Sequence, residues 1–282
     1  MLMNKKETVL VPLPSYNIIP ERDADKAPIL QCINLGITFG GLKAVENFNF
    51  ALGRTEIGGL IGPNGAGKTT VFNLLTKVYE PTEGTILLEG KDTKAMSTAQ
   101  INHAGIARTF QNIRLFQNLS VEDNVKVAMD WQMKYSLVSG ILRLPSYWKE
   151  EKTAHKRALE LLSIFGMQDM ADEKAGSLPY GAQRRLEIVR AMATNPSLLL
   201  LDEPAAGMNP SETTELMENI SRIRDMFQIA ILLIEHDMNL VMNICEGIAV
   251  MNFGRIIAKG TPSQIQSNPD VIEAYLGKKK GA

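Results

Sequence analysis

The most informative stretch of the sequence reads Gly62-Pro63-Asn64-Gly65-Ala66-Gly67-Lys68-Thr69. It matches the pattern G-x-x-x-x-G-K-[ST], follows an apolar, strand-like segment at 57–61, and leads through Thr70 into a helix-like segment. Glycines in such a loop let backbone N–H groups turn toward phosphate oxygens, and the start of the helix adds the positive end of a dipole. We therefore predict that residues 62–70 bind the phosphates of a nucleotide, with Lys68 on the β- and γ-phosphates and Thr69 as a ligand of Mg²⁺.

A carboxylate pair, Asp202-Glu203, follows four consecutive leucines at 198–201. Such a run predicts a strand that is buried on both faces of a parallel sheet, and ligands bind at the carboxyl ends of such strands. Asp202 is then expected to hold Mg²⁺ through water, and Glu203 to orient and polarise the water that attacks the phosphate. An Asp-Glu pair that only caps a helix is the alternative, and the phosphate-binding loop favours the catalytic interpretation.

The composition is that of an ordinary globular protein, because 45% of the 282 residues are apolar and 22% are charged. The 30 Lys and Arg residues nearly balance the 31 Asp and Glu residues, so we expect no nucleic-acid partner. Cys32 and Cys245 lack the spacing of a disulfide framework or a zinc site, which fits a reducing compartment. The longest apolar run, 229–234, is far shorter than the roughly 18–20 residues of a membrane span, and we expect no signal peptide.

Hydrophobic patterns divide the chain into regions. Residues 1–28 are aperiodic and contain several prolines, which predicts an extended tail, and residues 278–282 are expected to form a short C-terminal tail. Short strands are expected at 29–33, 44–52 and 85–88. From about 181 to 251, helices and strands alternate, which predicts a parallel α/β sheet.

Residues 121–176 have a helical pattern and predict an inserted helical region. The apolar side chains recur on one helical face, with charges opposite, at Ala154, Ala158, Leu161, Leu162 and Phe165.

Further motifs follow in an order typical of one family, and over residues 29–277 the chain resembles an ATP-binding-cassette (ABC) ATPase. Gln111 matches the family's glutamine loop, residues 205–210 match its D-loop, and His236 matches its switch histidine. The resemblance implies ATP and Mg²⁺ as cofactors, with Gln111 near Mg²⁺ or the attacking water and His236 near the γ-phosphate. It also implies an α/β fold: a P-loop NTPase core with a parallel sheet, a small antiparallel β-subdomain and an inserted helical subdomain at about 121–176.

Two residues near the first strands are candidates for the adenine site. Phe39 occupies the position at which the family stacks an aromatic ring on adenine, and Val45 is expected to pack against the base or sugar. A phenylalanine that packs only in the core at the end of a strand is the alternative for Phe39. His103 and His155 have no comparable context and are assigned no role.

The signature segment departs from the family's usual LSGGQ and reads Leu178-Pro179-Tyr180-Gly181-Ala182. Pro179 lacks the hydroxyl that meets the partner's γ-phosphate in the family, so backbone N–H groups near Gly181 and the helix dipole must bind it. We expect altered affinity rather than an inactive enzyme, because Pro179 is compatible with the start of a helix. Gly58 is a second departure, since a β-branched residue is usual there, and the sequence offers no functional reason for it.

Several phrases narrow the resemblance to the ATP-binding subunit of high-affinity branched-chain amino acid importers. They lie at 39–45, 105–112, 184–188, 203–210 and 268–277, and a long helical insert that includes Ser139-Gly140 is also typical. Importers of urea or short-chain amides have similar subunits, and an exporter or lipid-transport cassette is the next alternative within the family.

The resemblance implies two cassettes arranged head to tail, with ATP between the phosphate-binding loop of one and the signature segment of the other. The second cassette is either an identical chain or a different one. Gln111 and the helical insert are expected to pass the motion to a transmembrane permease, which receives solute from an external binding protein. The chain would then lie at the cytoplasmic face of the cell membrane, held there by the permease. A soluble ABC ATPase acting on DNA or ribosomes, and a nucleotide-binding regulator without turnover, are the alternatives.

Overall fold

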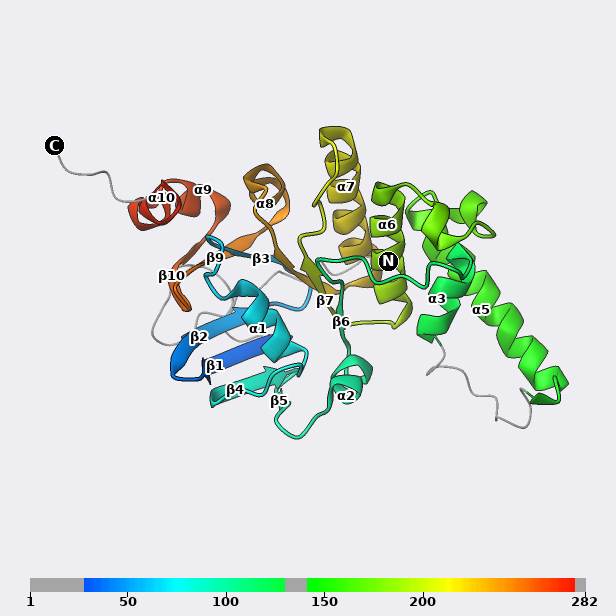
Figure 1. Cartoon of the computed structure of the whole chain (residues 1–282), viewed down its shortest axis with the longest axis horizontal. Helices are drawn as coiled ribbons and strands as arrows, with labels where there is room; N and C mark the ends of the chain where they lie inside the picture. The colour runs from blue at the N-terminus through cyan, green and yellow to red at the C-terminus, as the bar shows by residue number, and fades with distance from the viewer. Residues whose placement is uncertain (1–27, 130–140, 277–282) are drawn as a thin grey trace, which may run out of the picture.

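The computed structural model describes residues 28–129 and 141–276, and two β-sheets form the core of this part of the chain (Figure 1). The strands are β1 (Leu30–Phe39), β2 (Leu42–Leu52), β3 (Ile57–Ile61), β4 (Glu83–Leu88), β5 (Lys91–Asp92), β6 (Ile106–Arg108), β7 (Leu198–Asp202), β8 (Ala230–Ile234), β9 (Gly247–Asn252) and β10 (Arg255–Gly260). The helices are α1 (Lys68–Leu75), α2 (Thr98–His103), α3 (Val121–Met129), α5 (Pro145–Ile164), α6 (Tyr180–Ala193), α7 (Pro210–Phe227), α8 (Met238–Ile244), α9 (Pro262–Gln266) and α10 (Pro269–Leu276), with short 3-10 turns at Gln168–Met170 and Ala175–Ser177.

The larger sheet has the strand order β10-β9-β3-β8-β7-β6. Neighbouring strands are parallel except at one edge, where β10 runs antiparallel to β9. The predicted parallel sheet is thus confirmed, and β6 and β10 are additions that the sequence patterns did not reveal. Because β3, β7 and β8 are parallel, the residues that follow them reach the same edge of the sheet. Gly62, Glu203 and His236 are therefore brought to one place.

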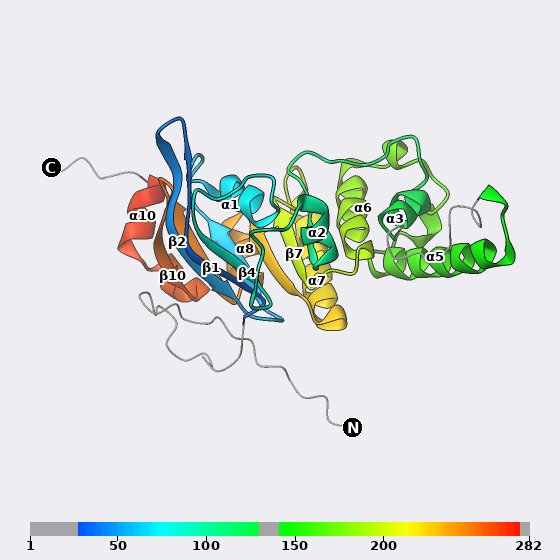
Figure 2. The same cartoon turned by 90° about the horizontal axis from the view of Figure 1, so that it is seen from below.

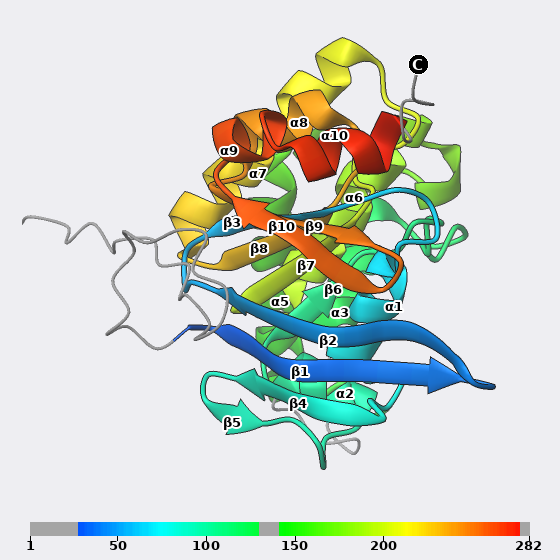
Figure 3. The same ribbon diagram turned by 90° about the vertical axis from the view of Figure 1, so that its left-hand side faces the viewer.

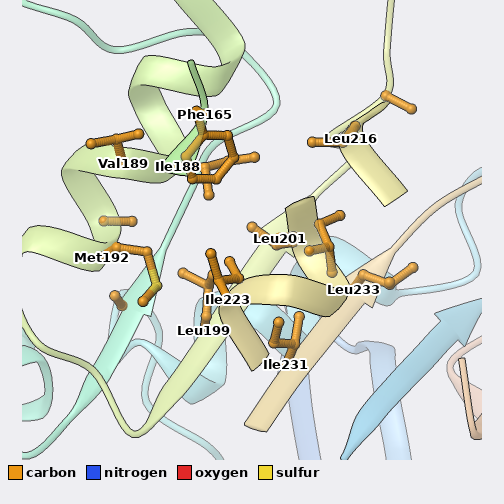
Figure 4. Close-up of a cluster of buried hydrophobic side chains, with 14 of the residues drawn as sticks. Phe165, Ile188, Val189, Met192, Leu199, Leu201, Leu216, Ile223, Ile231 and Leu233 are labelled. Carbon is orange, nitrogen blue, oxygen red and sulfur yellow. The ribbon is translucent and has the colours of Figure 1, made fainter. Parts of the chain in front are cut away.

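The strand predicted from the four leucines is buried on both faces. Leu199 and Leu201 of β7 pack in a cluster with helices α6 and α7, whereas Leu198 and Leu200 pack in a second cluster with α1 and the smaller sheet. Figure 4 shows the first cluster, in which side chains of β7, β8, α6 and α7 converge with Phe165. Because β7 is packed on both faces, its position in the sheet is fixed, and with it the position of the carboxylates at its end.

The smaller sheet is antiparallel, with the strand order β2-β1-β4-β5. Its first strand extends to Phe39, beyond the predicted end at residue 33, because β1 keeps pairing with β2 through several irregularities of register. Gly40 and Gly41 close this hairpin with φ of 51° and 90°. Helix α1 lies between the two sheets, as Figure 3 shows, and packs its Val71 and Phe72 against both.

The helical insert extends to one side of the sheets, and α10 lies at the opposite end (Figure 2). Helix α5 buries the five residues predicted to share a face, which are Ala154, Ala158, Leu161, Leu162 and Phe165 at its end. The described parts of 121–176 contain α3, α5 and the 3-10 turns that follow, and residues 130–140 of the predicted insert lie outside the described ranges.

The two glycines of β3 have a packing explanation. A Cβ atom at Gly58 would lie 2.6 Å from Cδ1 of Leu52, and one at Gly59 would lie 3.1 Å from Sγ of Cys245. Larger neighbouring side chains thus fill the space that a β-branched residue would occupy at position 58.

Some predictions concern residues outside the described ranges. They include the tail at 1–28, of which only Pro28 is described, the C-terminal tail at 278–282 and the Ser139-Gly140 pair. Within the described ranges, no helix is both long enough and apolar enough to span a membrane.

Candidate active site

The loop between β3 and α1 has the backbone that its glycines require. Gly62 and Gly67 have φ of 150° and 103°, and Gly67 immediately precedes the helix. A Cβ atom at Gly62 would lie 2.1 Å from the carbonyl oxygen of Met251, and one at Gly67 would lie 2.8 Å from that of Ala44. Only glycine therefore allows the loop to close against β9 and β2 directly before α1.

Lys68 is held inside this loop. Its ammonium group donates hydrogen bonds to the carbonyl oxygens of Gly62 at 2.7 Å and Pro63 at 3.0 Å, and the residue is 9% exposed. Burial lowers the pKa of Lys68, whereas the charges of Glu203 and Asp202 raise it. The ammonium group is thus positioned before any phosphate arrives, and a phosphate oxygen can replace the carbonyl groups as acceptor.

A cavity of about 630 Å³ opens over the loop. Residues 64–70 form one wall, Gln111 and Glu203 form a second, and residues 42–44 with 253–254 form a third. This volume is within the range of small-molecule sites, and the polar lining is dominated by the start of a helix. The cavity therefore suits a phosphorylated ligand.

Glu203 lines the cavity, and two other predicted site residues lie near its carboxylate. Gln111 donates a hydrogen bond from Nε2 to Oε2 of Glu203 at 3.1 Å, and Nδ1 of His236 lies 3.9 Å from the same oxygen. Glu203 has φ of 49°, and its N–H donates to the carbonyl oxygen of Ile234 at 2.9 Å. The left-handed backbone turns its carboxylate away from the strand and into the cavity, where it can accept a hydrogen bond from water.

Asp202 has a partner that the sequence did not predict. Its Oδ2 accepts from Nη2 of Arg108 at 2.8 Å, and both side chains are at most 5% exposed. Nη1 of Arg108 donates to Oδ1 of Asn73 on α1 at 2.7 Å. Arg108 therefore fixes one carboxylate oxygen of Asp202 and leaves the other available.

The oxygen-bearing side chains beside the loop suit a Mg²⁺ ion. Among the described residues, no cluster of three or more His, Cys, Asp or Glu side chains could hold a metal ion. Thr69, Gln111 and Asp202 provide oxygen atoms beside the loop, and a Mg²⁺ ion usually completes such a set with phosphates and water.

Several predicted site residues lie outside the lining of this cavity, namely Gly62, Pro63, Asp202, His236, Phe39, Val45 and Gly181. Phe39 is 42% exposed and makes an edge-to-face contact with Tyr79 at 5.1 Å between ring centroids. Val45 is 1% exposed and packs in the core, so in this conformation it does not face a ligand. Gly181 lies in the first turn of α6, and a Cβ atom added there would lie 2.8 Å from Oε1 of Glu212. Their binding roles remain predictions.

Three further buried charged residues support the site. Arg184 of α6 donates to the carbonyl oxygens of Phe110 and Gln111 and pairs with Glu187 at 2.9 Å. Glu235 follows β8 and accepts hydrogen bonds from backbone N–H groups on two loops. A charge directly after a core strand was a detectable signal for Glu235, whereas nothing in the helical pattern of α6 distinguished its buried charges from exposed ones.

Comparisons with known proteins agree with this geometry. A family model described as ABC transporter matches residues 45–206, and one described as branched-chain amino acid ATP-binding cassette transporter matches residues 255–280. The chain is 51% identical over 250 residues to the high-affinity branched-chain amino acid transport ATP-binding protein LivG of Escherichia coli (strain K12), covering 89% of this chain and 98% of the relative. The identity to BraF, which bears the same description, of Pseudomonas aeruginosa (strain PAO1) is 45%, with the same coverage. The ADP conformation of MJ1267, an ATP-binding cassette of an ABC transporter, has a TM-score of 0.77 and 30% identity, covering 90% of this chain and all of the solved chain.

Proposed function

The chain belongs to the ABC transporter family as an ATP-binding subunit with ATPase activity, and on that premise we propose that it drives a membrane importer of branched-chain amino acids. The position of Glu203 carries the hydrolytic part of this proposal. Its carboxylate projects into the cavity over the phosphate-binding loop, hydrogen-bonded to Gln111 and within 3.9 Å of His236. The solute is inferred from the printed descriptions of the relatives.

Each residue then has a role in hydrolysis. Lys68 and the N–H groups of the loop bind the β- and γ-phosphates. Glu203 accepts a hydrogen bond from the attacking water, and Gln111 holds Glu203 in the orientation that this contact needs. The ring of His236 is 66% exposed with Nδ1 3.9 Å from Glu203, and we infer that it donates to the γ-phosphate.

A Mg²⁺ ion would be held by Thr69, Gln111 and, through water, Asp202, and it would neutralise charge that develops on the phosphates. Arg108 keeps Asp202 in place for this contact by its buried ion pair.

The position of Gly181 supports a shared site. Gly181 is absent from the lining of the cavity in its own chain, yet it lies in the first turn of a helix whose N–H groups and dipole suit an anion. We infer that this segment binds the γ-phosphate of a second cassette, identical or different, arranged head to tail. The pair would lie at the cytoplasmic face of the cell membrane, bound to permease subunits that receive solute from an external binding protein.

A size-exclusion experiment with ATP tests the shared site. Glu203→Gln should retain ATP and accumulate a dimer, and adding Gly181→Asp should abolish that dimer because two negative groups would meet in the interface. Gly181→Asn is the matched control of similar size without the charge, and it should dimerise better than Gly181→Asp. If Gly181→Asp dimerises as well as Glu203→Gln alone, the segment is not at the nucleotide interface.

The transported solute is tested with the whole transporter. The chain should co-purify with membrane permease subunits, and in reconstituted complexes leucine, isoleucine or valine with the external binding protein should stimulate ATP hydrolysis. Stimulation by urea or a short-chain amide alone would contradict the proposed solute and leave the hydrolytic mechanism intact.

A further inference from the structure

We propose that Glu235 is a positioning residue that ties the loop after Glu203 to the loop carrying His236, so that both respond together when a second cassette binds. This inference rests on the proposed head-to-tail function. It goes beyond that function because it assigns the link between the two loops to one buried carboxylate outside the cavity lining.

The carboxylate of Glu235 accepts hydrogen bonds from both loops. Oε1 accepts from the N–H of Ala205 at 2.8 Å, and Oε2 accepts from the N–H groups of His236 at 3.0 Å and Asp237 at 3.3 Å. Its side chain has no exposed surface. Hydrogen bonds to an ionised acceptor are shorter and stronger than neutral ones, so this junction is rigid.

A carboxylate suits this junction because its two oxygens point in different directions. A hydroxyl group has a single oxygen on a short side chain, and an amide has one acceptor oxygen beside a donor. Burial raises the pKa of Glu235, and the N–H groups of Ala205, Asp237 and His236 oppose that shift. The chain therefore buries an acidic group at a cost and compensates for it with bonds to the two loops.

The first loop leads from the catalytic carboxylate toward the signature segment. Ala205 follows Glu203 after one residue, and the ring of Tyr180 packs against Gly207, where a Cβ atom would lie 3.0 Å from Cε1 of the tyrosine. Tyr180 is the first residue of α6 and precedes Gly181. The signature segment is therefore connected to Glu235 through the contact of Tyr180 with Gly207, the chain from Gly207 back to Ala205, and the hydrogen bond of Ala205.

The second loop leads back into the cavity of the same chain. Asp237 accepts from the N–H of Asn239 at 2.9 Å and caps α8, so the backbone on both sides of His236 is held. The imidazole ring itself is 66% exposed, with Nδ1 3.9 Å from Glu203. A shift of the first loop would therefore displace the backbone of His236 through Glu235 and change the position of the ring over the nucleotide.

The test compares Glu235→Gln with a matched control, Glu56→Gln. Glu56 is also fully buried and accepts a backbone N–H, from Gly53 at 2.8 Å, but it precedes β3 and so lies at the opposite end of the sheet from the site. Both changes remove a buried charge and should lower the melting temperature. Glu235→Gln leaves one of the two loops facing an amide N–H₂ group in place of an acceptor, whereas Glu56→Gln changes a carboxylate remote from both loops.

Three quantities are measured on each full-length variant: affinity for a fluorescent ATP analogue, turnover at saturating ATP, and the ATP-dependent dimer in the Glu203→Gln background. We expect Glu235→Gln to bind nucleotide and dimerise like the control, while its turnover falls about 10- to 100-fold below that of Glu56→Gln, as expected for a misplaced reacting group. Glu235→Asp keeps both acceptor oxygens and should recover part of the turnover. The same variant tests the inference if Glu235→Gln does not fold.

Turnover of Glu235→Gln within about twofold of Glu56→Gln would overturn the inference, because that difference is a negligible free energy. Turnover of Glu235→Asp no better than that of Glu235→Gln would also overturn it. Failure of the proposed function is read separately, since it would appear as the absence of an ATP-dependent dimer in Glu203→Gln alone.

Discussion

Replacing Arg184 by methionine would break the connection between the signature helix α6 and the glutamine loop. Arg184 is 1% exposed, its Nη1 donates to the carbonyl oxygen of Phe110 at 2.6 Å, and its Nη2 donates to that of Gln111. The same guanidinium lies 2.9 Å from Oε2 of Glu187, which is 3% exposed. Methionine retains much of the volume but removes every donor.

The expected cost follows from what remains in the core. Glu187 would be left as a buried carboxylate without its cation, a situation that destabilises proteins by about 3–5 kcal/mol. Replacing Glu187 by leucine at the same time removes that charge, and a buried pair replaced by apolar residues is often nearly neutral. The double variant Arg184→Met/Glu187→Leu should therefore be more stable than Arg184→Met, with a coupling free energy of about 2–3 kcal/mol.

The pH dependence provides a second readout. Burial raises the pKa of Glu187, while its bonds to Arg184 and to the N–H of Phe110 oppose the shift. Removing Arg184 raises this pKa further, and a carboxyl group whose pKa is raised on folding favours the folded state at low pH and loses that contribution as pH rises through the folded pKa. The stability deficit of Arg184→Met relative to the wild type should therefore shrink from about pH 7.5 to about pH 5.5.

Urea denaturation of the wild type, both single variants and the double variant measures these free energies. A deficit of Arg184→Met that stays constant or grows as pH falls would refute the reasoning, as would additive effects of the two changes. The double variant should also hydrolyse ATP more slowly than its stability explains, because the backbone of Gln111 loses its tether.

Three further outcomes are expected. Lys68→Ala should weaken binding of a fluorescent ATP analogue. Glu203→Gln should bind the analogue normally and lose about 10²–10⁴-fold in turnover. Normal binding by Lys68→Ala, or weak binding by Glu203→Gln, would contradict the assigned roles. Burial lowers the pKa of Lys259 to about 8, although its ammonium group donates a hydrogen bond to a backbone carbonyl. As pH rises from about 7.5 to about 9.5 the folded protein loses this proton while the unfolded chain largely keeps it, so the wild type should gain about 1–2 kcal/mol of stability relative to Lys259→Met. Urea titrations at both pH values check this gain. Gly58→Val should lower the free energy of unfolding by about 1–3 kcal/mol, because its Cβ would meet a leucine methyl group at 2.6 Å, and a variant as stable as the wild type would show that β3 has spare room.

Much of the site was predictable because its residues belong to short contiguous patterns. The phosphate-binding loop, the leucine strand before Asp202 and the strand before His236 each reveal their structure within about ten residues. Parallel pairing of β3, β8 and β7 then brings Gly62, Glu203 and His236 to one edge, since residues after parallel strands share that edge. Family resemblance identified Gln111 as a site residue, but its hydrogen bond to Glu203 is visible only in the structure.

The partners of the buried charges that organise the site could not be identified from the sequence alone. Arg108 meets Asp202 across 94 residues, Arg184 meets Phe110 across 74, and Glu235 meets Ala205 across 30. A charged residue beside a strand or on a helix usually points to water, and sequence periodicity does not reveal which ones are enclosed. The extension of β1 and the glycines of β3 are similar cases, because both depend on neighbours from another strand.

The sequence by itself therefore determined the chemistry of the site and the sheet edge on which it lies, because both follow from local motifs and from the burial pattern of single strands. Only the tertiary structure decided which buried partner orients each catalytic group and that Phe39 and Val45 lie outside the cavity. The physical reason is that hydrogen bonds and close packing depend on distances between atoms of segments remote in the chain. Those distances exist only after both sheets and the helices between them have packed together.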